Sequence, residues 1–197
     1  MSPALPSLED LRFLWEGLPE GLLGHLTRVS GLAGKLAQRW GVDPEAAELA
    51  GFLHDLARAQ TPQGLLERAR TLDMPVDPVE EQFPLLLHGR VGARVVEDAL
   101  ETEATDVLAA IAWHSTARWG MSDLEKVVFL ADKLDPGKQD GHYPPGLEAL
   151  DELACSNLNG AVVFYLDWQI RHLLDRGRLV HLAAIDARNA LLIGVRA

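Results

Sequence analysis

Residues 50–57 read Ala-Gly-Phe-Leu-His-Asp-Leu-Ala, which places a histidine and an aspartate inside a run of apolar residues. The apolar neighbours on both sides indicate that this segment is buried. A buried carboxylate without a partner is strongly unfavourable, so another group must compensate the charge of Asp55. His54 and Asp55 therefore mark the start of a buried polar site.

Four further polar residues lie in comparable apolar surroundings. Asp132 ends the run Val-Val-Phe-Leu-Ala-Asp at 127–132, His114 ends a run that begins at Val107, and His88 follows three leucines. His25 follows Leu-Leu-Gly at 22–24. Consecutive members of the series His25, His54, His88, His114 and Asp132 are separated by about the length of one helix and the connection to the next. The side chains are therefore expected to converge at the centre of a helical bundle, where metal sites are commonly assembled.

The expected donor set is four imidazoles and two carboxylates: His25, His54, Asp55, His88, His114 and Asp132. It suits a first-row metal such as iron or manganese, and zinc stays open although thiolate partners are absent. Six ligands exceed what one hydrolytic metal takes from protein, so we expect two metal ions bridged by Asp55. A single histidine is more often structural, and we assign His142, His172 and His181 to that class.

Helical spacing of apolar residues and helix punctuation predict an all-α fold, a single bundle with the metal site at its centre. We expect a first helix at 7–18, opened by a capping box at Ser7, and a second helix at 20–40 stopped by Gly41. Asp43-Pro44 and Thr61-Pro62 each predict a helix start. The remaining expectations are a loop at 73–84, helices at 85–100, 105–114 and 123–134 with a capping box of Ser122 and Glu125, a loop at 136–146, a long amphipathic segment at 147–176 and a short tail.

The whole chain of 197 residues is expected to form one domain, with a core at about 20–192. Its formal net charge of −11 is the wrong sign for binding nucleic acid or anionic lipid. No apolar run suggests a membrane span, and Cys155 has no cysteine partner for a disulfide. These features predict a soluble, cytoplasmic protein. The amphipathic segment at 147–176 offers a surface for a homodimer.

The assembled residues resemble the HD-domain superfamily of metal-dependent phosphohydrolases, whose pattern is a His, a His-Asp pair and a later Asp. Longer stretches at 50–58, 86–93, 111–116 and 121–136, and the similarity from about 20 to 192, resemble the YqeK-type symmetrical bis(5′-nucleosyl)-tetraphosphatases. The resemblance implies a two-metal, iron-containing centre that His88 and His114 join. It also implies cleavage of diadenosine tetraphosphate into two ADP, with the nucleotide as the small-molecule partner.

In this scheme Asp55 and Arg58 are the candidate catalytic residues. Arg58 lies one helical turn beyond His54 and is the first candidate for a phosphate clamp, because a guanidinium can hold two phosphate oxygens at once. Arg118 and Lys138 are the second candidates for binding substrate. They lie where this chain departs from the family's usual stretches, so the departures concern substrate contacts and leave the ligand set intact.

Two other functions stay open from the sequence. Another HD-type nucleotide phosphohydrolase, a 5′-nucleotidase or a nucleoside triphosphohydrolase, needs only the four-residue pattern and would not require His88 and His114. A non-catalytic nucleotide-sensing module would leave the buried His and Asp side chains as a persistent cost to stability. The number of metal ions per chain distinguishes the first alternative, and the presence of turnover distinguishes the second.

Overall fold

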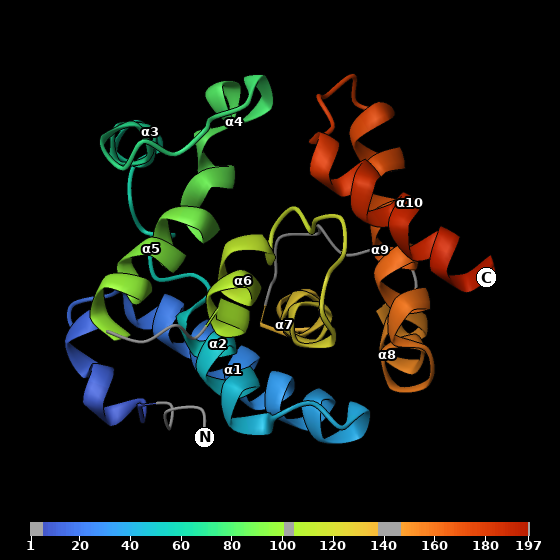
Figure 1. Ribbon diagram of the computed structural model, residues 1–197, viewed down its shortest axis with the longest axis horizontal. Coiled ribbons are helices and arrows are strands. Elements are labelled where there is room, and N and C mark those ends of the chain that lie inside the picture. Colours follow the sequence, from blue (N-terminus) through green and yellow to red (C-terminus); the bar gives the residue numbers. More distant parts are fainter. Residues whose placement is uncertain (1–5, 101–104, 138–146, 197) are drawn as a thin grey trace.

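The computed structural model describes residues 6–100, 105–137 and 147–196, and this part of the chain is helical without a β-strand (Figure 1). The 3-10 helices are η1 (Glu9–Leu14) and η2 (Pro84–Leu87). The α-helices are α1 (Glu20–Trp40), α2 (Pro44–Leu53), α3 (Pro62–Thr71), α4 (Pro78–Gln82), α5 (His88–Leu100), α6 (Thr105–Trp113), α7 (Asp123–Lys133), α8 (Leu147–Ser156), α9 (Leu158–Leu174) and α10 (Leu182–Arg196). The predicted all-α fold is confirmed. None of the described helices is long and apolar enough to cross a membrane.

Local capping fixes several helix boundaries as predicted. The side chains of Asp43 and Thr61 accept hydrogen bonds from backbone N–H groups in the first turns of α2 and α3, and a proline follows each cap. Ser122 and Glu125 form a reciprocal capping box at the start of α7. Gly41 ends α1 in the left-handed conformation, with φ +67°.

Helix α7 is the centre of the bundle. Every residue from Leu124 to Lys133 is buried, which is the pattern of a helix surrounded by other elements. Helices α1, α2, α6 and α9 pack against it, and Figure 1 looks along its axis in the middle of the molecule. The polar side chains at the end of α7, Asp132 and Lys133, are therefore held inside the protein.

The crossing of α1 and α2 brings the first ligand candidates together. A Cβ atom on Gly51 would lie 3.1 Å from Ser30 Cα and 3.2 Å from Val29 O, so a larger residue here would require the two backbones to shift slightly apart. The Ser30 hydroxyl also donates a hydrogen bond to Glu48 O across the crossing, at 2.9 Å. The turn that follows α2 is consequently fixed against the middle of α1.

A second, smaller core fixes the start of α5. It contains Ala57, Leu65, Leu66, Ala69, Leu87 and Val91, contributed by the turn after α2, by α3, by η2 and by α5. Met74, Val76 and Leu85 pack on its edge. Because Leu87 is fully buried here, the next residue along the chain is held at a defined position between α3 and the main core.

The C-terminal helices form the opposite side of the molecule from α3, α4 and α5 (Figure 1). Helix α9 packs on α7, and α8 and α10 pack on α9. The indole N–H of Trp40 donates a hydrogen bond to Ala154 O at 2.8 Å, which joins α8 to the end of α1. The space between the two sides, above the end of α7, is where the polar site lies.

Two predictions in the N-terminal half are wrong in detail. The expected helix at 7–18 is the 3-10 helix η1, although Ser7 and Asp10 do exchange the predicted hydrogen bonds. The expected loop at 73–84 contains α4 and the start of η2, because Asp77 forms a capping box with Glu80 and Pro78 follows as the first helical residue. A five-residue helix is too short to show an apolar period.

Two predictions in the C-terminal half are also corrected. The segment at 147–176 is two helices, because the backbone of Asn157 is extended, with φ −152°, and its side chain caps α9 through Gly160 N–H. The expected short tail is the 15-residue helix α10. The residue before this helix is His181, which is an unusual N-cap, so the sequence did not indicate a helix start here. The prediction for 138–146 lies outside the described residues.

Candidate metal centre

The six predicted ligand candidates converge in the structure. His25 lies on α1, His54 and Asp55 in the turn after α2, His88 at the first position of α5, His114 directly after α6, and Asp132 on α7. All six are buried, and each has a relative exposure of 8% or less. Their side-chain nitrogens and oxygens form three overlapping groups whose atoms lie within 4.8 Å of one another. The side chains thus come from five separate segments to one point.

Backbone carbonyls fix the orientation of three imidazoles. The Nδ1–H group of His54 donates to Gly51 O at 2.7 Å, and that of His114 donates to Ile111 O at 2.8 Å. His88 Nδ1 makes the equivalent contact with Leu85 O, so in each case the acceptor lies three residues earlier. Because Nδ1 carries the proton, Nε2 is left with a free lone pair that points into the site.

His25 is oriented by a carboxylate instead of a carbonyl. Its Nδ1–H group donates to Asp135 Oδ2 at 2.7 Å. Asp135 is fully buried and also accepts hydrogen bonds from the Arg28 guanidinium, at 2.6 Å and 3.0 Å. Burial favours the neutral acid, but the hydrogen bonds from Arg28 and His25 outweigh it and lower the pKa of Asp135 to about 2. The ionised carboxylate leaves His25 Nε2 free for the site.

The shortest contacts of Asp55 divide the histidines into two donor sets that share this carboxylate, and a further group of His54, His114 and Asp132 links the two sets. Asp55 Oδ2 lies 3.6 Å from the Nε2 atoms of both His25 and His54, and Asp132 Oδ1 lies 3.3 Å and 3.5 Å from the same two atoms. Asp55 Oδ1 lies 2.8 Å from His88 Nε2 and 3.3 Å from His114 Nε2. The two oxygens of one carboxylate therefore face two different pairs of histidines.

This arrangement fits cations. The facing Nε2 atoms lie 3.2 Å apart in the pair His25 and His54, and 3.0 Å apart in the pair His88 and His114, and the lone pairs of each couple repel. Asp55 Oδ1 is buried without a hydrogen-bond donor among the described residues. A buried acceptor that faces other acceptors is unfavourable unless a positive charge lies between them. The observed donor types are those of divalent first-row metal ions.

The protonation behaviour of the site leads to the same conclusion. Burial lowers the pKa of His114 to about 3, so its imidazole is neutral and able to donate a lone pair. Burial also acts against charge on His54 and Asp55, but their mutual attraction prevails. It raises the pKa of His54 and, with the nearby histidines, holds the pKa of Asp55 well below its usual range. The carboxylates therefore recruit positive charge into a buried site.

Asp135 gives a testable prediction about metal retention. Asp135→Asn removes the ionised acceptor that orients His25 and is expected to weaken metal binding by roughly 10- to 100-fold. Chelator competition followed by elemental analysis measures this affinity. Asp167→Asn is the matched control, because Asp167 also pairs with an arginine, Arg188, away from the centre. Equal metal affinity of Asp135→Asn and wild type would show that His25 does not depend on Asp135.

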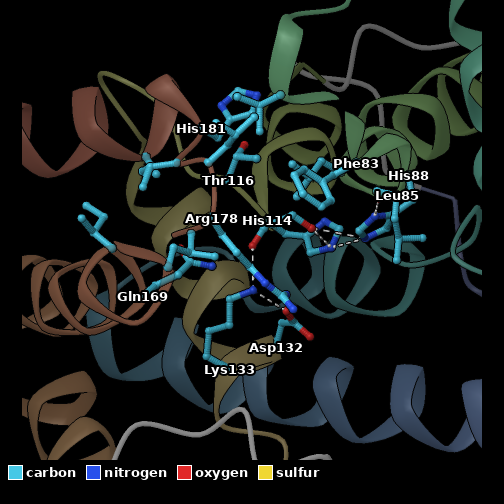
Figure 2. A pocket seen from close by; sticks show the side chains of 18 of the residues that line it. Phe83, Leu85, His88, His114, Thr116, Asp132, Lys133, Gln169, Arg178 and His181 are labelled. Carbon is cyan, nitrogen blue, oxygen red and sulfur yellow. Dashed lines mark hydrogen bonds and ion pairs between the residues drawn. The ribbon is translucent and has the colours of Figure 1, made fainter. Parts of the chain in front are cut away.

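A cavity of about 470 Å³ opens above the centre, a size typical of small-molecule sites. Asp55, His88, His114 and Asp132 lie on its wall, and most of the remaining lining is apolar. Figure 2 shows His88 and His114 side by side, with Lys133 between Asp132 and the backbone of His114. Any ligand in this cavity therefore lies directly against the metal-ligand candidates.

The predicted substrate-binding residues have different positions. Arg58 lines the cavity, and its side chain is exposed. Arg118 does not line it, because its guanidinium forms two hydrogen bonds with the buried carboxylate of Glu125, at 2.6 Å and 2.9 Å, at the start of α7. Lys138 lies outside the described residues. Of the three candidates, Arg58 alone has a described position beside the centre.

Several cavity residues were not selected from the sequence. Lys133 Nζ donates to Asp132 Oδ2 at 2.7 Å and to His114 O at 3.2 Å, so it fixes two of the ligand candidates. The only feature of the sequence that could have pointed to Lys133 is that it directly follows Asp132. Gln169, Arg178 and His181 reach the cavity from α9 and from the connection to α10. Arg178 and His181 lie in the short connection between α9 and α10, which has no long apolar run to mark them as buried.

Comparison with known proteins identifies the relatives of this chain. The model of the HD domain family matches residues 22–137, a span that includes all six ligand candidates. The chain is 34% identical over 181 residues to a symmetrical bis(5′-nucleosyl)-tetraphosphatase of Halalkalibacterium halodurans, which covers 89% of this chain and 91% of that protein. It is 32% identical over 155 residues to the protein of the same name from Bacillus subtilis, covering 79% and 81% of the two chains.

A solved structure agrees with these matches. The crystal structure of a predicted HD superfamily hydrolase involved in NAD metabolism, from Clostridium acetobutylicum, superposes with a TM-score of 0.87 at 29% identity. The alignment covers 98% of this chain and 100% of that one, so it includes the C-terminal helices. By sequence match and by fold, this chain belongs to the HD domain family.

Proposed function

We propose that this protein is a metal-dependent hydrolase of dinucleoside polyphosphates that cleaves diadenosine tetraphosphate symmetrically into two ADP. The observation that carries the proposal is the pair of donor sets that share Asp55 on the wall of the cavity. Two relatives that align with most of this chain have the name of a symmetrical bis(5′-nucleosyl)-tetraphosphatase. The donor sets therefore support metal-dependent hydrolysis, and the names of the two relatives support a dinucleoside tetraphosphate as the substrate.

We infer two metal ions, of which iron is the first candidate and manganese the second. His25, His54, Asp132 and Asp55 Oδ2 would hold one ion, and His88, His114 and Asp55 Oδ1 would hold the other. Bound divalent ions supply Lewis-acid charge and lower the pKa of water for attack on phosphorus. Elemental analysis of the purified protein counts them. One ion per chain would favour the four-residue pattern of other HD nucleotide hydrolases.

The protein's own residues have binding and orienting tasks in this reaction. The buried ring of histidines and aspartates is held rigid by its outward hydrogen bonds, so little reorganisation accompanies the reaction. Lys133 donates a hydrogen bond to Asp132 at the cavity wall, next to where the reacting phosphate would lie. The mostly apolar lining of the cavity lowers the local dielectric constant, which strengthens each of these electrostatic interactions.

Product analysis tests the proposed reaction. Diadenosine tetraphosphate is incubated with protein reconstituted with Fe²⁺ or Mn²⁺, and the nucleotides are separated by anion-exchange chromatography. ADP as the sole product is expected. AMP together with ATP would refute symmetrical cleavage. Release of phosphate from AMP, with no action on the dinucleotide, would favour the 5′-nucleotidase interpretation, and no turnover at all would favour a nucleotide-sensing module.

Arg58 gives a prediction about substrate use. Arg58→Ala removes a guanidinium that lines the cavity without a hydrogen bond or ion pair to the described residues. We expect about a tenfold higher KM for diadenosine tetraphosphate, the usual scale for one charge-assisted contact in a partly exposed site. The metal content should be unchanged. Loss of metal from Arg58→Ala would instead assign Arg58 to the support of the centre.

The homodimer also stays a prediction. Four large apolar side chains are exposed on α9, on α10 or on their connection, namely Leu174, Leu179, Leu182 and Ile193. Leu174 lies in the segment at 147–176 from which the sequence predicts an interface, and the other three follow that segment. Light scattering coupled to size-exclusion chromatography measures the mass in solution, and a mass of one chain at micromolar concentration would contradict the prediction.

A further inference from the structure

Two arginines with free guanidinium groups line the cavity. Arg58 and Arg178 are the arginines of the described chain that contribute to its wall, and neither has a hydrogen bond or an ion pair with a described side chain. Arg90, Arg118 and Arg188, in contrast, are each paired with a carboxylate. An arginine that faces a cavity without a partner keeps all its donors available for a ligand. Arg58 lies near the His54-Asp55 pair, whereas Arg178 lies on the cavity wall formed by α9, α10 and their connection.

The backbone at Arg178 is fixed by the end of α9. Gly177 has φ +59°, the left-handed conformation that commonly terminates a helix. The N–H groups of Gly177 and Arg178 donate to Leu174 O and Leu173 O, both at 2.9 Å, which completes a Schellman motif. Arg178 is thus the last residue of the turn that closes α9, and its backbone position relative to α9 is determined.

A second anchor lies three residues further along the chain. His181 Nδ1 accepts a hydrogen bond from Ala183 N–H at 3.2 Å, which joins the ring to the first turn of α10. His181 Nε2 lies 2.8 Å from Asp77 Oδ2, and Asp77 is itself the cap of α4. This close contact places the start of α10 beside α4, although it lacks the geometry of a hydrogen bond. The contact and the end of α9 flank the segment with Arg178 on both sides.

Figure 2 shows Arg178 among the side chains that surround the cavity, between Gln169 of α9 and the ligand candidates His114 and Asp132. The match of the HD domain family ends at residue 137, so Arg178 lies outside the part that carries the metal centre. The chain thus adds a cation to the metal site from a separate structural element. A bound polyphosphate needs such a charge beyond the reacting phosphorus, because every phosphate of the chain is anionic.

We propose that Arg178 is a substrate-binding residue that holds the phosphate chain from the α9–α10 wall, opposite the wall that carries Arg58. The proposal rests on the proposed function and extends the binding set to the C-terminal helices. A guanidinium can donate two parallel hydrogen bonds to one phosphate group, which an ammonium cannot do in a fixed geometry. Arg178 binds and orients the phosphates and takes no part in proton transfer.

The test compares Arg178→Gln with the matched control Arg171→Gln. Arg171 is an exposed arginine on α9 that does not line the cavity and has no partner among the described side chains. In Arg178→Gln the KM for diadenosine tetraphosphate should rise about tenfold, with kcat and metal content close to wild type. Arg171→Gln should match wild type in all three. Arg178→Lys, which keeps the charge but loses the fork, should give an intermediate KM.

Calorimetric titration with ADP in the presence of Mn²⁺ supplies a readout without turnover. Weaker ADP binding by Arg178→Gln, with wild-type binding by Arg171→Gln, supports the proposal even if the dinucleotide is not the natural substrate. Equal ADP affinity in wild type and Arg178→Gln overturns it, as does a wild-type protein that binds no ADP. Formation of AMP and ATP by wild type would refute the proposed function while leaving the ADP titration decisive for Arg178.

Discussion

Asp55→Ala is expected to lower the rate of diadenosine tetraphosphate hydrolysis by on the order of a thousandfold or more. The physical reason is that each oxygen of Asp55 belongs to a different donor set, so one substitution removes a ligand from both. Both of the proposed ions should therefore bind weakly. The measurements are kcat/KM with added Mn²⁺ and the metal content of the protein as purified.

The fold of the Asp55→Ala protein should survive. Asp55 is surrounded by histidines whose own positions are fixed by outward hydrogen bonds, and the main apolar core does not include it. Helical circular dichroism close to that of wild type is expected. Asp123→Ala is the control, because Asp123 lies on the surface at the start of α7 and pairs only locally with Lys126. Wild-type activity or metal content in Asp55→Ala would refute the role of this carboxylate.

Gly89→Ala is expected to destabilise the protein by about 2 kcal/mol and to release the second of the two proposed metal ions. A Cβ atom on Gly89 would lie 2.8 Å from Ala112 O and 2.9 Å from Ile111 O, where the backbones of α5 and α6 cross. Backbone atoms cannot rotate away as a flexible side chain can. The helices must therefore separate, and His88 on α5 moves away from His114 beyond α6.

Gly92→Ala is the matched control for this substitution. Gly92 lies on the same helix, but its added Cβ would meet nothing closer than Ala57 N at 3.7 Å, an ordinary contact. Because alanine is the better helix former, this variant should be as stable as wild type or more stable. Urea denaturation and metal counting are applied to both. If Gly89→Ala kept wild-type stability and two ions per chain, the close crossing would not be what holds the two histidines together.

The family relationship explains why a few His and Asp residues of the sequence were enough to predict the fold and the metal site. The relatives named as symmetrical tetraphosphatases align over most of the chain, and so does the solved structure of the hydrolase from Clostridium acetobutylicum. The matched HD domain covers α1 to α7, where the ligand candidates lie. Helices α9 and α10 and their connection lie outside this match and supply a wall of the cavity. On the proposed function, recognition of the nucleotide is divided between two parts of the chain.

The helix starts and the ligand candidates were accessible from sequence because their signals are local. A capping residue such as Asp43 or Thr61 acts on backbone groups two or three positions away, within one turn. A polar residue such as Asp132 inside an apolar helix is visible from its immediate neighbours. Helix α4 was not predicted, because its five residues are too few to show the apolar periodicity of a helix.

The contacts that orient the site link residues far apart in the chain. His25 donates to Asp135, 110 residues away, and His181 reaches Asp77 across the cavity. The sequence predicts Arg118 as a substrate ligand, but its guanidinium binds Glu125 and does not line the cavity, whereas Arg178, which the sequence does not single out, does. A charged side chain binds whichever opposite charge the packing of helices brings near it, and spacing along the chain does not encode that choice.

The sequence by itself determined the all-α class, the main helices and the six buried His and Asp side chains, because burial and capping act through neighbouring residues. The tertiary structure decided how those six divide into two sets around Asp55, which residues orient them, and which arginines face the cavity. These features depend on distances of a few ångströms between separate helices. Close crossings such as those at Gly51 and Gly89 fix such distances, and they exist only once the helices have packed.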